Sequence, residues 1–142
     1  MVPPLAVRDE KLRKEEILRG RVAFRRVFQA RESIRGELVR LHFRLSPTSA
    51  ASQIRVGFAV ASSFRLAVQR NRARRLMREA YRLMKGEVIA AFRALNMDGE
   101  VIFVYHGGGD NADPRRVKRQ MIDEDMRQLF QTLIHGVKER KE

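Results

Sequence analysis

The sequence contains no cysteine and no tryptophan, and only 7% of its residues are aromatic. Without cysteine the chain can form no disulfide and no Cys-ligated zinc or iron–sulfur site. No apolar run approaches the roughly 20 residues of a transmembrane helix. Residues 1–16 lack the apolar segment of a secretory signal. We therefore expect a soluble, cytoplasmic protein with no membrane partner and a mainly aliphatic core.

Acidic residues are scarce relative to basic ones: 17 Asp and Glu stand against 30 Lys and Arg, a net charge of +13. Residues 19–44 hold eight basic and two acidic side chains, residues 62–85 hold eight and one, and residues 98–142 are close to neutral. An excess this large indicates a polyanionic partner, either nucleic acid or an anionic membrane surface. The two basic blocks are typical of two walls of one binding surface, provided that the fold brings them together.

Hydrophobic patterning predicts one α+β domain in the order helix, strands, helix, strand, helix. The strands are predicted over residues 38–45, 54–61 and 101–105. The first helix is predicted over residues 22–28, and the second from about residue 73 to either Gly86 or Asn96. The last helix is predicted to begin at Asp113 as the N-cap, with Pro114 at the first helical position. The last two strands can pair in parallel, because a helix separates them.

The first two predicted strands each have a distinctive second face. The strand over residues 38–45 alternates between an apolar face and a mainly basic face that carries Arg40, His42 and Arg44. The following strand has small residues, including Gly57, on one face. Small side chains on a sheet leave room for another segment to lie against it.

Residues 70–82 form the most informative segment, with six Arg and no Lys. On a helix Arg74, Arg78 and Arg82 recur every four residues and form a stripe. Guanidinium groups fit phosphate oxygens and stack on bases, and Asn71 adds a donor and an acceptor near the helix start. A solvated basic face is an equally good interpretation of an Arg-rich helix, and composition alone does not choose among RNA, DNA and an acidic protein.

The order of residues in this region resembles the bacterial ribonuclease P protein family. That family has an R-V/I-G strand, a short loop and then an A-V-x-R-N-R-x-K/R-R-x-x-R-E-A-F/Y-R helix, which resemble residues 55–61 and 67–82. Residues 18–28 resemble its first helix, and the resemblance extends over residues 18–134. Three departures are Ser62 and Ser63 in place of two Lys, Arg65 near a usual Gly, and His42 in place of an aromatic residue.

The resemblance implies a compact α+β domain whose β-α-β crossover is left-handed, although right-handed crossovers are the rule. It implies an extension over residues 1–17, a domain over 18–135 and a tail over 136–142. It also implies a non-catalytic protein subunit that binds a catalytic RNA and assists Mg2+-dependent endonucleolytic removal of the 5′ leader of precursor tRNA. The expected partners are these two RNAs, with no protein partner evident, and Mg2+ is expected to be bound mainly through RNA.

The resemblance also assigns residues to two RNA contacts, with no catalytic residue and no metal ligand in the protein. The RNA-binding helix would use Arg70, Asn71, Arg72, Arg74, Arg75, Arg78 and Arg82. The leader cleft would use Phe24, Phe28, Arg25, Arg40, His42 and Arg44. Aromatic stacking contributes about 1–3 kcal/mol per base and tolerates any sequence, as a variable leader requires. Core packing is an equally good interpretation of Phe28.

Two other functions stay open at this point: a structural RNA-binding protein of ribosomal type, and a free-standing nuclease. The scattered histidines His42, His106 and His135 argue against a metal site or catalytic triad. Residues 123–125 are all acidic and predict a solvated face, because successive helical residues point 100° apart. Residues 107–109 are all Gly and predict a turn, since no Lys-Ser/Thr of a phosphate-binding loop follows them.

Overall fold

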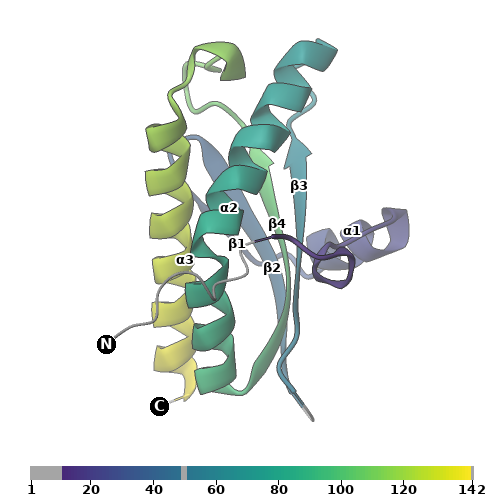
Figure 1. The fold of residues 1–142 in the computed structure, drawn as a ribbon, viewed down its shortest axis with the longest axis vertical. Coiled ribbons are helices and arrows are strands. Elements are labelled where there is room, and N and C mark those ends of the chain that lie inside the picture. Colours follow the sequence, from purple (N-terminus) through teal and green to yellow (C-terminus); the bar gives the residue numbers. More distant parts are fainter. Residues whose placement is uncertain (1–10, 49–50, 142) are drawn as a thin grey trace.

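A four-stranded sheet in the order β1-β2-β4-β3 lies at the centre of the computed structural model, which describes residues 11–48 and 51–141 (Figure 1). The strands are β1 (Ser33–Arg35), β2 (Val39–Pro47), β3 (Ile54–Val60) and β4 (Met97–Tyr105). β2 pairs antiparallel with β1 and β4, and β3 pairs in parallel with β4. The three predicted strands are confirmed, but β1 was not predicted. Its three residues are too short to show an alternation.

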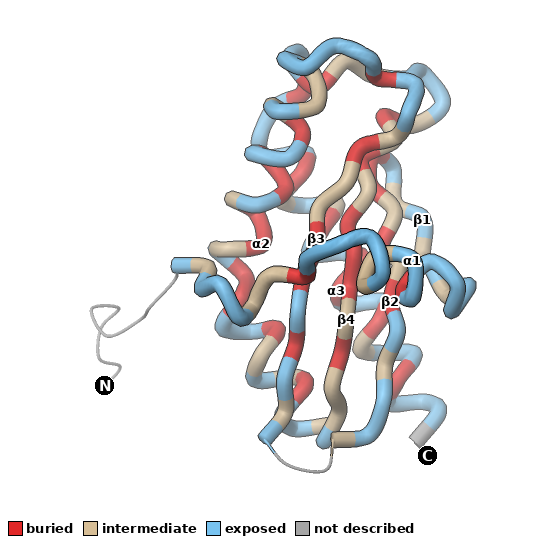
Figure 2. The backbone as a smooth tube through the Cα atoms, turned by 90° about the vertical axis from the view of Figure 1, so that its right-hand side faces the viewer, coloured by how far each residue is buried: buried red, intermediate tan, exposed pale blue. Residues whose placement is uncertain are grey.

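Helices cover both faces of the sheet, and the helical elements are η2 (Lys14–Glu16), α1 (Arg21–Gln29), α2 (Ala67–Leu95), η3 (Pro114–Arg116) and α3 (Arg119–Lys141). The long helices α2 and α3 lie side by side on one face, and α1 crosses the other, as the two views together show (Figure 2). α2 continues past Gly86 to the later of its two predicted ends, where Asn96 takes the left-handed conformation, with φ of 54°. Asn tolerates this conformation better than most residues, so it is a natural helix stop.

The connection from β3 through α2 to β4 is left-handed. Figure 1 shows both strands running upward, α2 in front of the sheet, and β4 to the left of β3. A right-handed crossover in this view would place β4 to the right. The single α+β domain and its unusual crossover, both expected from the family resemblance, are therefore confirmed.

The predicted start of the last helix is wrong. Asp113 does cap a helical turn, since its Oδ1 accepts the Arg115 backbone N–H at 3.0 Å, but that turn is only η3. Val117 has an extended backbone and is 6% exposed. Burying Val117 in the core interrupts the helical path, so α3 begins two residues later, at Arg119.

The acidic run over residues 123–125 does not form the predicted solvated face. Asp125 accepts the backbone N–H groups of Glu37, Leu38 and Val39 at 3.0, 2.9 and 2.8 Å and thereby fixes the β1–β2 turn. Asp123 is half-buried, and burial raises its pKa. Only Glu124 is exposed. The helical spacing correctly predicted that these three side chains point in different directions, but it could not predict which groups each one contacts.

The segment before α1 is joined to both β3 and α2. The Leu18 N–H donates to the Val56 carbonyl at 2.8 Å, so this segment pairs with the outer edge of β3. The Lys85 ammonium, on a residue 5% exposed, donates to the Lys11 carbonyl at 2.7 Å and to Glu16 Oε1 at 3.0 Å. Residues 11–18 therefore pack against the sheet and α2, and residues 1–10 of the extension expected over residues 1–17 lie outside the described residues.

At the other end, α3 runs through residues 136–141 of the tail expected over residues 136–142, and Val137 is buried in the core. No helix within the described ranges is long and apolar enough to cross a lipid bilayer.

Candidate nucleic-acid interface

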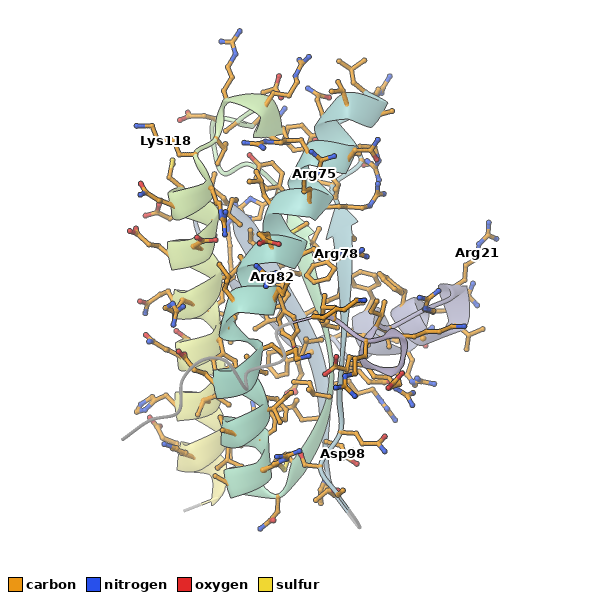
Figure 3. The ribbon with its side chains drawn as sticks, in the orientation of Figure 1. Arg21, Arg75, Arg78, Arg82, Asp98 and Lys118 are labelled. Atoms are coloured by element: carbon orange, nitrogen blue, oxygen red, sulfur yellow. The ribbon has the colours of Figure 1, made fainter. Side chains whose placement is uncertain are left out.

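The arginines of α2 lie beside its buried stripe. Ala73, Leu76, Met77 and Ala80 are buried against the sheet and α3. Figure 3 shows Arg75, Arg78 and Arg82 along the side of α2 that is turned away from the sheet (Figure 3). The predicted stripe is therefore present on the surface of the helix.

Three of these arginines are exposed and form no ion pair with any described residue: Arg74, Arg75 and Arg78. We call these three the α2 ridge. Asn71 beside them is also exposed, and Arg72 is half-buried. Unpaired guanidinium groups keep all of their donors available for an anionic partner.

Arg70 differs from the ridge, because its guanidinium is directed into the protein. It donates to the carbonyl oxygens of Val60, Ala61 and Phe64 at 3.3, 3.2 and 3.0 Å. These carbonyls belong to the end of β3 and the loop after it. Arg70 thus joins the first turn of α2 to the sheet, and a substitution there would disturb packing as well as any RNA contact.

Arg82 also has an intramolecular partner, since its Nη2 lies 2.6 Å from Oε1 of Glu79. The two residues are three positions apart, about one turn of α2. The hydrogen bond from Arg82 is the main reason that the pKa of Glu79 is lowered. Glu79 therefore stays ionised and reduces the net charge that this end of the stripe offers.

The aromatic residues of α1 lie across the other face of the sheet. The Phe24 ring covers Gly57, where an added Cβ would come within 2.5 Å of Phe24 Cζ. Phe28 lies 6.4 Å from Phe24 and 4.8 Å from the His42 ring, which it meets edge to face at 77°. Phe28 is 38% exposed, whereas Val27 beside it is fully buried. Phe28 is thus at the rim of the sheet face and not in the core. We call Phe24, Phe28 and His42 the aromatic cleft, after the leader cleft that the family resemblance implies at these residues.

His42 enters this cleft as a neutral ring. Burial, and then the charge of Arg40, lower its pKa below the usual value. Arg40 is itself held by a 2.9 Å hydrogen bond to Ser33 Oγ. His42 therefore places an uncharged ring beside Phe28, at a strand position where the family that the sequence resembles usually has an aromatic residue.

One carboxylate arranges two arginines below the cleft. Arg26 donates to both oxygens of Glu100, at 3.0 and 2.5 Å, and Arg44 donates to Oε1 at 3.2 Å. The hydrogen bonds from Arg26 are the first cause of the lowered pKa of Glu100. Sequence reasoning missed Arg26 and Glu100. The only signal would have been the β2–β4 register, which places Arg44 directly opposite Glu100.

We expect Gly57→Ala to push the Phe24 ring off the sheet and to lower the free energy of unfolding by about 1–3 kcal/mol, because the added methyl group overpacks this contact. Chemical denaturation of the purified protein measures the change. The control is Gly86→Ala on α2, where nothing lies within 4 Å of the added Cβ. That change should stabilise the helix by about 0.5–1 kcal/mol. A Gly57→Ala protein as stable as the wild type would show that the ring does not rest on this glycine.

The two basic blocks of the sequence do not form two walls of one groove, as the composition suggested. The α2 helix, which carries the ridge, and α1, which carries Phe24 and Phe28, lie on opposite faces of the sheet (Figure 2). The domain therefore presents two separate surfaces, one purely cationic and the other both aromatic and cationic.

Comparison with known proteins decides the family. The model of the family described as Ribonuclease P matches residues 12–133. The chain belongs to the ribonuclease P protein family. A ribonuclease P protein component from Chlorobium phaeobacteroides is 38% identical over 81 residues, which is 54% of this chain and 56% of that relative. The chain thus spans little more than half the length of this curated relative in the match.

Solved structures of ribonuclease P proteins share the fold. The Staphylococcus aureus protein has a TM-score of 0.62 at 15% identity and covers 84% of this chain and 96% of its own. The Thermotoga maritima protein has a TM-score of 0.61 at 24% identity and covers 81% and 94%. Identities this low support the fold alone, so the roles of individual residues rest on the geometry above.

The loop where this chain departs from the ribonuclease P protein family is polar and exposed. Ser62, Ser63 and Arg65 are all exposed, and Ser63 Oγ donates to Asn111 Oδ1 at 3.2 Å. Ser63 therefore joins this loop to the loop after β4, and neither serine carries the charge of the two Lys usual in the family.

The loop after β4 is a turn, as predicted from its three glycines. Gly107 and Gly108 have φ of 80° and 75°, which other residues rarely adopt. His106 Nδ1 accepts the Gly108 N–H at 2.9 Å. Over residues 11–48 and 51–141, no group of three or more His, Asp or Glu side chains is placed to hold a metal ion.

Proposed function

We propose that this chain is the protein subunit of ribonuclease P in the cytoplasm. In this proposal the α2 ridge binds the catalytic RNA, and the aromatic cleft binds the single-stranded 5′ leader of precursor tRNA. The chain thereby assists endonucleolytic removal of the leader to give the mature 5′ end. The observation that carries the proposal is that one domain has two separate surfaces, of different chemistry, that are each suited to binding nucleic acid.

The chemistry of the α2 ridge suits a folded RNA. Three exposed guanidinium groups on one rigid helix can each bridge phosphate oxygens with paired donors. The major groove of duplex RNA is too deep and narrow for base readout, so RNA shape and backbone are what such a helix would recognise. Recognition of this kind fits a large RNA with a fixed fold.

The chemistry of the aromatic cleft suits a single strand of variable sequence. Phe28 and His42 offer ring surfaces, and Arg25 and Arg44 are exposed nearby. Stacking on such rings is worth about 1–3 kcal/mol per base and does not depend on base identity. A leader that differs from one precursor to the next requires this tolerance.

The hydrolytic chemistry is assigned to RNA and Mg2+, with Mg2+ bound mainly through RNA. Two of the carboxylates are engaged within the protein: Asp125 with backbone N–H groups, and Glu100 with Arg26 and Arg44. The side chains of this protein thus bind and orient the two RNAs, and no proton transfer is assigned to them.

Stimulation of cleavage tests the proposal. The purified protein is mixed with the catalytic RNA of the same organism and a precursor tRNA at near-physiological salt and Mg2+. We expect faster cleavage at the correct 5′ position than with RNA alone. A structural RNA-binding protein of ribosomal type would bind without stimulation, and a free-standing nuclease would cleave without the RNA subunit. Either result would reject the proposal.

We expect Phe28→Ala to weaken binding of a precursor with a leader by about 5- to 100-fold, since one stacked base is lost. Binding of mature tRNA, which lacks the leader, should change little. The matched control is Val22→Ala on the same helix, where the side chain is 72% exposed. Dissociation constants of the assembled holoenzyme for both RNAs measure the effect. An equal loss for both would make Phe28 a structural residue.

A further inference from the structure

A basic segment that the sequence analysis did not assign lies between η3 and α3. It contains Arg115, Arg116, Lys118 and Arg119, within a region whose total charge is close to neutral. The acidic residues of that region lie mainly on α3 and β4. The net charge summed over residues 98–142 is therefore close to zero and does not reveal the basic segment. Its four cations are concentrated on five residues at one end of the molecule.

Two contacts join this segment to one flank of α2. At its start, η3 packs against α2, and Gln69 of α2 is close enough to Asp113 to help lower the pKa of that carboxyl. At its end, Arg119 Nη2 lies 3.7 Å from Glu79 Oε1. Residues 69, 72 and 79 share one flank of a helix, because they are separated by three and seven positions. Arg72 must therefore lie on the flank that faces the basic segment.

The segment is held rigidly by the residues that alternate with its cations. Pro114 and Val117 are buried, with Val117 only 6% exposed. Arg116 and Lys118 flank Val117 and are both exposed. An extended backbone at Val117 turns its neighbours to the opposite side, toward solvent.

The four cations are not equally available. Arg115 pairs with Asp113 at 2.7 Å, and hydrogen bonds from Arg115 hold the pKa of that carboxyl well below its usual range. Arg119 is close to Glu79 and Asp123. Arg116 and Lys118 form no ion pair with any described residue. Figure 3 shows Lys118 at the same end of the molecule as Arg75.

We propose that Arg116 and Lys118, together with Arg72 and Arg75, form a second phosphate-binding strip for an RNA strand that runs along the flank of α2. The inference rests on the proposed function, because the strip continues the α2 ridge and would extend the contact with the catalytic RNA. Two pairs of cations on adjacent rigid elements suit the regular phosphates of a nucleic-acid backbone. In this proposal the segment between η3 and α3 adds an RNA contact to the one that the arginine-rich helix α2 makes.

Paired charge removal tests the strip. The double variant Arg116→Gln/Lys118→Gln is compared with Arg93→Gln/Lys138→Gln, which loses the same charge from exposed positions near the other ends of α2 and α3. Dissociation constants for the catalytic RNA are measured across salt concentrations. We expect the first variant to bind about 10-fold more weakly and its log–log salt slope to fall by roughly 1.4–1.8, since each phosphate contact contributes roughly 0.7–0.9. The control should change by less than about twofold.

The location of the strip is tested independently by site-specific crosslinking, because the chain has no cysteine of its own. A photo-crosslinker on the thiol of Lys118→Cys is unique in the chain, as is one on Arg75→Cys. We expect both to mark neighbouring nucleotides of the catalytic RNA. Two matched double variants with equal affinity, or no RNA crosslink from position 118, would overturn the strip and leave the function standing. A wild-type protein that binds the catalytic RNA no better than an unrelated RNA would instead reject the function.

Discussion

Replacing Arg74, Arg75 and Arg78 together by Gln should weaken binding of the catalytic RNA by about 100- to 1,000-fold, because three charge-assisted phosphate contacts are lost. The log–log slope of affinity against salt should fall by roughly 2–3 for the same reason. Folding should be unaffected, since these side chains form no ion pair with the described residues. Equilibrium binding across salt concentrations measures both quantities.

The matched variant for the ridge replaces the same three arginines by Lys. It keeps the charge but removes the planar fork of donors. We therefore expect the salt slope to stay near that of the wild type while affinity falls by about 10-fold. If the Gln variant bound like the wild type, α2 would be a solvated face and the interface would lie elsewhere.

Asp125→Ala should lower the free energy of unfolding by about 2–4 kcal/mol. Its carboxylate accepts three backbone N–H groups of the β1–β2 turn, two of them partly buried. Donors left unpaired in the fold cost about 1–3 kcal/mol each unless water replaces the lost acceptor. Urea denaturation measures the loss.

The neighbouring Glu124→Ala is the control for Asp125, because that residue is exposed and should change stability by less than about 0.5 kcal/mol. Asp125→Asn should give an intermediate loss, because one acceptor oxygen remains. A loss below about 1 kcal/mol for Asp125→Ala would show that water satisfies the turn equally well.

Local patterns predicted most of the fold. The strict alternation of β2 identified both its buried and its open face, and the apolar stripe of α2 separated its core side from its arginines. These predictions succeeded because period and burial are set by nearby residues. β1 was missed because three residues are too short to show an alternation, and the break at Val117 was missed because it depends on packing against distant parts of the chain. The left-handed crossover came only from the family resemblance and contradicts the general rule.

The candidate site was less accessible to sequence reasoning. The stripe over residues 70–82 was located correctly, but the inward direction of Arg70 depends on carbonyls at the end of β3. The Arg26–Glu100 pair joins residues 74 positions apart. Such partners follow from strand register and helix placement, which composition and spacing do not determine.

The short pairing between Leu18 and Val56 has a consequence for the behaviour of the protein before it meets RNA. A sheet exposes unpaired backbone groups along its outermost strands, and these can recruit further chains into aggregates. Here the margin at β3 is partly capped by residues 17–18, and the opposite margin, β1, is only three residues long. Both features shorten the stretch of unpaired backbone that these two margins offer to a further chain.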